Sequence, residues 1–178
     1  MFSIILATLD SERALVPTLA ALVPGATAGI VREVIVADGG SRDSTQQVAD
    51  IAGCEFLVSA EPPGTRLAAA ARAARGDWLM FLQPGAVPAP TWIDETIAFV
   101  DRAGSAPRAA VFADEAGVLS ALGRLLLPAP RQGLIIGKTV YRELGGHRAE
   151  AHAERALLRR IGRRRLTRLR TAVTFPDI

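Results

Sequence analysis

Cysteine is almost absent from this sequence, and its absence excludes two classes of protein. The single Cys54 has no partner for an internal disulfide, so the chain is not a small secreted scaffold held together by disulfides. Only His147 and His152 are available as histidine ligands beside it, so a cysteine-based zinc site is not expected.

Long apolar runs are missing as well. No stretch approaches the ~20 consecutive apolar residues that a transmembrane helix needs. At the N-terminus no basic segment precedes an apolar one, and Asp10, Glu12 and Arg13 come too early for a signal peptide. The sequence therefore predicts a cytoplasmic protein.

Positive charge is scarce in most of the chain and concentrated near its end. The 21 basic and 18 acidic side chains give a net charge of +3, but residues 1–153 carry −3 and residues 154–178 carry +6. Arg155, Arg159 and Arg163 recur every fourth residue in this basic segment, which predicts one basic stripe on a helix. Three interpretations stay open: peripheral contact with an anionic membrane, a clamp for phosphate groups, or a solvated face without a ligand. Aromatic residues make up only 5% of the chain and none lies among these arginines, so no nucleic acid is expected as a partner.

The residues that are present indicate a globular α/β protein. Apolar residues make up 49% of 178 positions, enough for one domain with a substantial core. Short apolar runs at 2–6, 33–37, 55–58 and 78–82 predict strands, and helical patterns separate them. This alternation predicts a mostly parallel central sheet with helices on both faces. The first helix is expected to stop at Pro24-Gly25, and the next two to cover 44–52 and 65–75.

The second half is less regular. Helices are predicted at 92–100, 118–127, 139–144 and 153–161, and strands at 109–112 and 134–136.

Chemically active residues follow three of the predicted strands. Ligands of open parallel sheets bind beyond the carboxyl ends of the strands, so these segments are the candidate site. The three segments are Thr8-Leu9-Asp10, Asp38-Gly39-Gly40-Ser41 and Gln83-Pro84-Gly85. Asp38 is placed to accept a proton from a ribose hydroxyl or a nucleobase N–H, and Gly39 lets backbone approach such a ligand. The alternative is that the second segment is only a turn with a capping role.

Several common nucleotide and hydrolase motifs are absent. No GxGxxG follows the first strand, no Walker A pattern occurs, and no GxSxG is present. A dinucleotide-binding Rossmann domain, a P-loop enzyme and a hydrolase with a nucleophile elbow are therefore not indicated.

Four sequence blocks, in order, carry a resemblance to a known family. They are IILATLDSE (4–12), EVIVADGGSRDST (33–45), RAARGDWLMFLQPGAVPAPTW (72–92) and QGLIIGKTVYRELGGH (132–147). Together they resemble the family 2 glycosyltransferases, which have the GT-A fold. The resemblance implies a single GT-A-like domain over 1–178, with a nucleotide-binding half at 1–100. An acceptor-side half would follow at 101–178 and include the basic C-terminal segment.

The resemblance also implies a nucleotide-sugar donor and assigns residues to it. The loop at Thr8, Leu9 and Asp10 would contact the nucleotide, and Asp38 would bind the base. Arg66 would help to hold the diphosphate, or would simply be a solvated residue at a helix start.

One departure from the family concerns the metal. The family carries Asp-x-Asp after its fourth strand, where two carboxylates hold Mn²⁺ or Mg²⁺ against the sugar diphosphate. Here Gln83 and Gly85 occupy these two donor-binding positions, and neither is a carboxylate. The resemblance therefore implies a divalent cation whose usual ligands are missing, and no metal ligand is predicted.

A second departure concerns the catalytic base. Family members often carry a Glu-Asp pair that supplies a base for the acceptor hydroxyl, and the comparable pair here is Glu154-Arg155. Glu154 is the candidate base, although the neighbouring Arg155 is expected to keep the pKa of Glu154 low. One alternative is that Glu154 only caps the helix. His147 or His152 would then be the substitute base, unless each is a plain surface residue. The sequence thus predicts either a glycosyltransferase with an unknown acceptor or a catalytically inactive binding protein that kept the fold.

Overall fold

The computed structural model of the chain describes residues 1–103, 109–114, 130–150 and 152–176. Its strands are β1 (Phe2–Thr8), β2 (Val31–Asp38), β3 (Glu55–Val58), β4 (Trp78–Leu82), β5 (Val87–Pro88), β6 (Ala109–Asp114), β7 (Leu134–Gly137) and β8 (Leu166–Thr174). Its helices are α1 (Glu12–Thr27), α2 (Thr45–Ile51), α3 (Pro63–Ala73), α4 (Trp92–Ala103), α5 (Lys138–Glu143) and α6 (Ala153–Ile161), with short 3-10 helices η2 (Pro130–Gln132) and η3 (Arg163–Arg165). The helix predicted at 118–127 lies outside the described residues.

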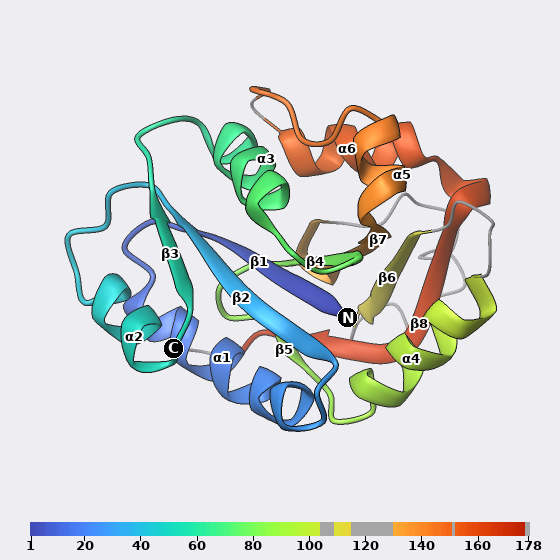
Figure 1. Cartoon of the computed structure of the whole chain (residues 1–178), viewed down its shortest axis with the longest axis horizontal. Helices are drawn as coiled ribbons and strands as arrows, with labels where there is room; N and C mark the ends of the chain where they lie inside the picture. Colours follow the sequence, from blue (N-terminus) through green and yellow to red (C-terminus); the bar gives the residue numbers. More distant parts are fainter. Residues whose placement is uncertain (104–108, 115–129, 151, 177–178) are drawn as a thin grey trace.

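One mixed sheet organises the described chain (Figure 1). Its strand order is β3-β2-β1-β4-β7-β6-β8-β5, and β1 to β4 form a parallel half. The second half is mixed, because β7 is antiparallel to β4 and β6, while β8 is parallel to β6. The predicted α/β class with a mostly parallel sheet is confirmed.

Helices cover both faces of this sheet, as Figure 1 shows. Side chains alternate along β1, so that Ile4 and Leu6 pack with the helices α1, α2 and α4. Ile5, between them, packs on the other face with α3, α5 and α6. All three side chains are fully buried, as expected of a strand with both faces covered.

The predicted stop of the first helix at Pro24-Gly25 is wrong, because α1 continues to Thr27. Tertiary packing outweighs the local signal here. A Cβ at Gly25 would lie 2.4 Å from the Trp92 ring, so glycine at this position leaves room for the indole. The Trp92 indole N–H also donates to the Ala21 carbonyl at 3.2 Å, which ties α4 to the end of α1.

The basic C-terminal segment differs most from its prediction. The helix α6 ends at Ile161, and Gly162 reverses the backbone with a φ of 71°. Arg163 therefore lies in η3 and not on a helical stripe with Arg155 and Arg159, so the predicted stripe is wrong. The chain then enters the sheet as β8, which the sequence analysis missed. The buried side chains of β8 are Leu169, Thr171 and Val173, and their spacing of two residues in the sequence is the period-two signal that would have found the strand.

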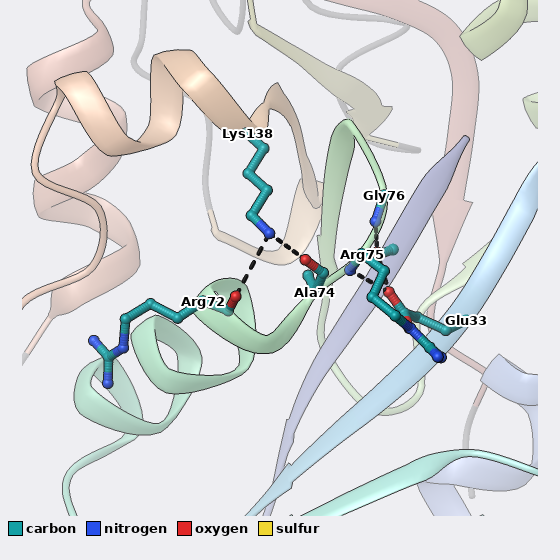
Figure 2. Close-up of polar contacts among 7 residues, drawn as sticks. Glu33, Arg72, Ala74, Arg75, Gly76 and Lys138 are labelled. Carbon is teal, nitrogen blue, oxygen red and sulfur yellow. Dashed lines mark hydrogen bonds and ion pairs between the residues drawn. The ribbon is translucent and has the colours of Figure 1, made fainter.

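Polar contacts fix the amino ends of the parallel strands, at the edge of the sheet opposite the candidate site (Figure 2). The Glu33 carboxylate accepts hydrogen bonds from the Ser3 hydroxyl at 2.5 Å and the Arg75 backbone N–H at 2.6 Å, and it pairs with the Arg75 guanidinium. Burial opposes ionisation of Glu33, but these contacts outweigh it and lower its pKa. Lys138 of α5 donates to the Ala74 carbonyl and so closes the end of α3. These contacts hold β1, β2, α3 and α5 together at the end of the sheet away from the candidate site.

Candidate functional site

A cleft of about 860 Å³ opens at the carboxyl ends of β1 and β4. The starts of α1, α3 and α6 form its other walls. The residues that line it are Ala7, Thr8, Leu9, Asp10, Ser11, Ala14, Pro62, Pro63, Gly64, Arg66, Leu67, Leu82, Gln83, Pro84, Ala149, Glu150, His152, Ala153, Glu154 and Arg155. Six of the nine predicted site residues are among them: Thr8, Leu9, Asp10, Arg66, Gln83 and Glu154.

Asp38 lies under the cleft and not on its wall. It is 1% exposed, and its carboxylate accepts hydrogen bonds from the Thr8 hydroxyl at 2.7 Å and the Ser41 hydroxyl at 2.5 Å. The backbone N–H groups of Gly40 and Ser41 each donate to its other oxygen at 2.7 Å. Burial raises the pKa of Asp38, but these four donors outweigh it and leave the pKa below its ordinary value. The turn that the sequence predicts as the alternative role of this segment is therefore present.

The loop after β1 is held by the loop after β2. Asp10 has a left-handed φ of 45°, its backbone N–H donates to the Ser41 hydroxyl at 2.8 Å, and its carboxylate accepts from the Arg42 backbone N–H at 2.7 Å. Leu9 beside it is 57% exposed at the cleft wall. An exposed apolar side chain on the cleft wall can pack against a ring of a ligand.

Arg66 on α3 is 7% exposed, so its interpretation as a solvated helix-start residue is wrong. Its Nη1 donates to the Thr8 and Ala37 carbonyls at 2.7 and 2.6 Å, which joins α3 to the ends of β1 and β2. The guanidinium also favours glycine at position 39, because a Cβ there would lie 3.1 Å from it and force one of the two groups to shift. Gly39 thus accommodates Arg66 and does not line the cleft.

Gln83 and Glu154 meet across the cleft. The Gln83 amide donates to the Glu154 carboxylate at 3.2 Å, joining the end of β4 to the first turn of α6. Gly85, by contrast, turns away with a φ of 89°. Its backbone N–H donates to the Thr18 hydroxyl on α1 at 2.9 Å, so Gly85 lies behind the cleft wall.

Two expectations for Glu154 are corrected. Burial raises its pKa, and the hydrogen bond from Gln83 only partly offsets this, so the expected lowering by Arg155 is wrong. Arg155 is exposed on the cleft wall, where water screens its charge. The carboxylate does not cap α6 either: the N-cap residue is His152, and the bond of Glu154 goes to Gln83. A partly buried carboxyl with a raised pKa has the properties of a general base.

The two histidines have different positions. His152 is exposed and lines the cleft. His147 is only 4% exposed and outside the cleft wall, so its interpretation as a surface residue is wrong.

The donor groups at the end of β4 do not fit a divalent cation. Mg²⁺ and Mn²⁺ take hard oxygen ligands, above all carboxylates. Here β4 is followed by Gln83, Pro84 and Gly85, and the Asp38 carboxylate is occupied by four protein donors. Within residues 1–103, 109–114, 130–150 and 152–176, no group of three or more His, Cys, Asp or Glu side chains is arranged to hold a metal ion.

Sequence analysis missed the wall formed by Pro62, Pro63 and Gly64. The signal was present, since proline is favoured at the first positions of a helix. Gly64 lets α3 touch the segment before α6: a Cβ there would lie 2.0 Å from the Arg148 carbonyl oxygen and 2.6 Å from the Ala153 Cβ.

We expect Gly64→Ala to push these two walls of the cleft apart. Overpacking against backbone typically costs 1–3 kcal/mol, so the free energy of unfolding should fall by about 2 kcal/mol. Chemical denaturation measures this, and Thr65→Ala on the same helix is the control. An alanine variant as stable as the wild type would contradict the close contact between α3 and Arg148.

The model of the family described as Glycosyl transferase family 2 matches residues 3–165, nearly the whole chain. The chain belongs to glycosyl transferase family 2. The resemblance noted in the sequence is thereby confirmed. A search of curated protein sequences finds no match.

Solved structures show that this family 2 chain has a GT-A-like fold. Glucosyl-3-phosphoglycerate synthase from Mycobacterium tuberculosis, in complex with Mn²⁺ and UDP-glucose, matches with a TM-score of 0.71 and 19% identity, over 100% of this chain and 72% of the synthase. S. aureus TarS 1–349 matches with a TM-score of 0.73 and 17% identity, over 97% of this chain and 59% of TarS. Among the described residues of this family 2 chain, no helix is both long and apolar enough to cross a membrane.

Proposed function

We propose that this family 2 chain transfers a sugar from a nucleotide-sugar donor to the hydroxyl group of an acceptor. The observation that carries the proposal is Glu154, a partly buried carboxylate with a raised pKa. It is held by Gln83 inside the large cleft at the strand ends. In open α/β sheets this edge is where ligands bind.

The donor would lie along the β1 side of the cleft. Thr8, Leu9 and Asp10 would contact the nucleotide, with Leu9 against the base. Asp38 would act on the nucleotide mainly by shaping the loop, because its own carboxylate already takes four hydrogen bonds. Arg66 would face the diphosphate with Nη2, for which the structure gives no partner among the described residues.

The chemical step would use Glu154 as general base. As the acceptor oxygen bonds to the anomeric carbon, its proton passes to the Glu154 carboxylate and the bond from that carbon to the diphosphate oxygen breaks. The nucleoside diphosphate leaves with the electron pair. The surrounding protein must therefore stabilise negative charge on the leaving group.

Protein cations would take this role here, because the residues after β4 do not fit a metal. Arg155 lies on the cleft wall, and α3 and α6 both begin there without a side-chain cap on their N–H groups. Uncapped helix starts and an arginine together favour a diphosphate.

We expect donor binding that does not depend on a divalent cation. Calorimetry with UDP-glucose, then with other UDP- and GDP-sugars, should give dissociation constants within about threefold in Mn²⁺ and in a chelator. Arg155→Gln should weaken binding about tenfold, as the loss of a charged hydrogen bond predicts. Arg159→Gln, an exposed arginine outside the cleft, is the control.

Three other results would speak against these proposals. Binding that requires Mn²⁺ would show metal ligands other than those at the end of β4. No heat with any nucleotide sugar would overturn donor binding altogether. Donor binding without transfer or hydrolysis would support the alternative, a binding protein that kept the fold and lost catalysis.

We propose further that the exposed arginines contact an anionic membrane peripherally. Arg163, Arg164 and Arg165 form a consecutive exposed run in η3. Each basic residue near such a surface contributes about 1 kcal/mol, so replacing all three with glutamine should weaken binding roughly 100-fold. Sedimentation with phosphatidylcholine vesicles, with and without phosphatidylserine, measures this. Binding that is unchanged in the triple variant, or insensitive to salt, would contradict the membrane contact.

A further inference from the structure

His147 is a buried residue that none of the steps above uses. It follows the turn after α5, is 4% exposed, and packs edge-to-face on Phe81 with ring centroids 4.7 Å apart. A polar ring in such a place needs hydrogen-bond partners for both nitrogens, since an unpaired buried polar group costs stability.

One ring nitrogen has a partner, and that contact assigns the ring proton. The Tyr141 hydroxyl accepts from the His147 backbone N–H at 2.9 Å and lies 3.0 Å from Nδ1. The hydroxyl has one proton to donate, and among the described residues its only hydrogen-bond contact that can accept this proton is Nδ1. Nδ1 then accepts, and the proton of the neutral ring must sit on Nε2.

The ring stays neutral over the physiological range. Burial, and after it the positive charge of Arg160, lower the pKa of His147 to about 4. Arg160 is fixed there because it donates to the Leu144 and Gly146 carbonyls, each at 2.7 Å. At neutral pH Nε2 is therefore a hydrogen-bond donor.

This donor has no partner among the described residues, and its residue, His147, lines a small void. Nε2 of His147 is buried and unpaired. The void of about 10 Å³ is lined by Phe81, Gly133, Leu134, His147, Glu154 and Leu158. That volume is about what the centre of one water molecule needs. His147 and Glu154 contribute the two polar side chains on its wall.

We propose that one buried water in this void accepts a hydrogen bond from His147 Nε2 and donates one to the Glu154 carboxylate. His147 is thereby a positioning residue for Glu154. The geometry alone supports the bridging water, whereas the role of that water in catalysis rests on the proposed function.

The link completes the support of the carboxylate. Gln83 donates to Oε2 from the β4 side, and the water donates from the His147 side. A second donor favours the charged form of Glu154 and opposes the rise in its pKa that burial causes. The other ionisable groups around Glu154 are Asp10, Arg66, Glu150, His152 and Arg155 in the cleft, and Tyr141 and Arg160 behind His147.

The titration of Glu154 itself tests the link without any assay of transfer. Carboxyl ¹³C NMR of glutamate-labelled protein follows the group, and its signal is assigned by its loss in Glu154→Gln. His147→Phe fills the ring space but removes the Nε2 donor, so the Glu154 midpoint should rise by about one pH unit, a tenfold change. His147→Gln keeps an amide donor near the same place, so the Glu154 midpoint should return most of the way to its wild-type value.

A crystal structure of the wild type provides the second measurement. It should show a water within hydrogen-bond distance of both Nε2 and the Glu154 carboxylate. An empty void, or a folded His147→Phe variant with an unchanged Glu154 midpoint, would overturn the proposal. If the chain transfers no sugar, the midpoint shift and the water remain, so failure of the proposed function is distinguishable from failure of the link.

Discussion

Glu154→Gln should abolish most sugar transfer while the protein stays folded. A general base contributes about 10²–10⁴-fold to a rate, so kcat should fall by that factor. Donor affinity should change little, because the glutamine keeps the size of the side chain and Glu154 would act on the acceptor. Release of nucleoside diphosphate measures kcat, and calorimetry measures donor binding.

The same variant should also be slightly more stable at neutral pH. The pKa of Glu154 is raised in the folded state, so its charged form is disfavoured by folding. Its contribution to stability is therefore present at low pH and lost as pH rises through the raised pKa. Glutamine does not titrate and avoids this loss. The wild-type rate should rise with pH through that same raised pKa, since only the ionised carboxylate accepts a proton.

Glu150→Gln is the matched control for Glu154, because it removes another carboxylate from the same cleft wall. It should leave kcat within about threefold of the wild type. A Glu154→Gln variant that transfers sugar at the wild-type rate would remove Glu154 from the mechanism and leave the exposed His152 as the base to test.

Asp38→Ala should have the largest effect on stability. The substitution leaves the Thr8 and Ser41 hydroxyls and two backbone N–H groups without their acceptor. A buried donor left unpaired costs about 1–3 kcal/mol, and water entering the space recovers part of this. The free energy of unfolding should therefore fall by about 3–5 kcal/mol at pH 7, measured by chemical denaturation.

The pH dependence of this effect follows from the lowered pKa of Asp38. A carboxyl with a lowered pKa stabilises the fold above its unfolded pKa, and that contribution disappears as pH falls through the folded value. The difference between wild type and Asp38→Ala should accordingly shrink in acid. Asp50→Ala, an exposed carboxylate on α2, is the control and should change stability by less than about 0.5 kcal/mol. Equal effects of the two substitutions would contradict the four hydrogen bonds.

Much of the parallel half could be predicted from local sequence. The strands at 55–58 and 78–82 have the bounds that the pattern predicts, and so does the helix at 153–161 outside this half. Apolar runs of strand length between helical patterns are sufficient there, because each residue's environment depends on close neighbours in the chain. The positions of the strand ends also placed Thr8, Asp10 and Gln83 at one edge of the sheet, where the structure brings them together with Glu154 of α6.

The errors have a common physical cause, which is contact between segments far apart in the chain. Pro24-Gly25 predicts the end of a helix, but the Trp92 ring occupies the space that a side chain at Gly25 would fill, and the helix continues. The predicted basic stripe included Arg163, but after Ile161 the chain leaves the helix and pairs with β6 and β5 as β8.

For this protein the sequence by itself determined the α/β class, the family and the edge of the sheet that carries the site. The class and the edge follow from periodicity and from the positions of the strand ends, and the family follows from the resemblance of four sequence blocks. Only the tertiary structure decided what each charged side chain does. It turned Asp38 and Arg66 inward as supports, buried His147, and raised the pKa of Glu154 where an adjacent arginine suggested the opposite. Burial and hydrogen bonding set ionisation, and both depend on the residues that folding brings together.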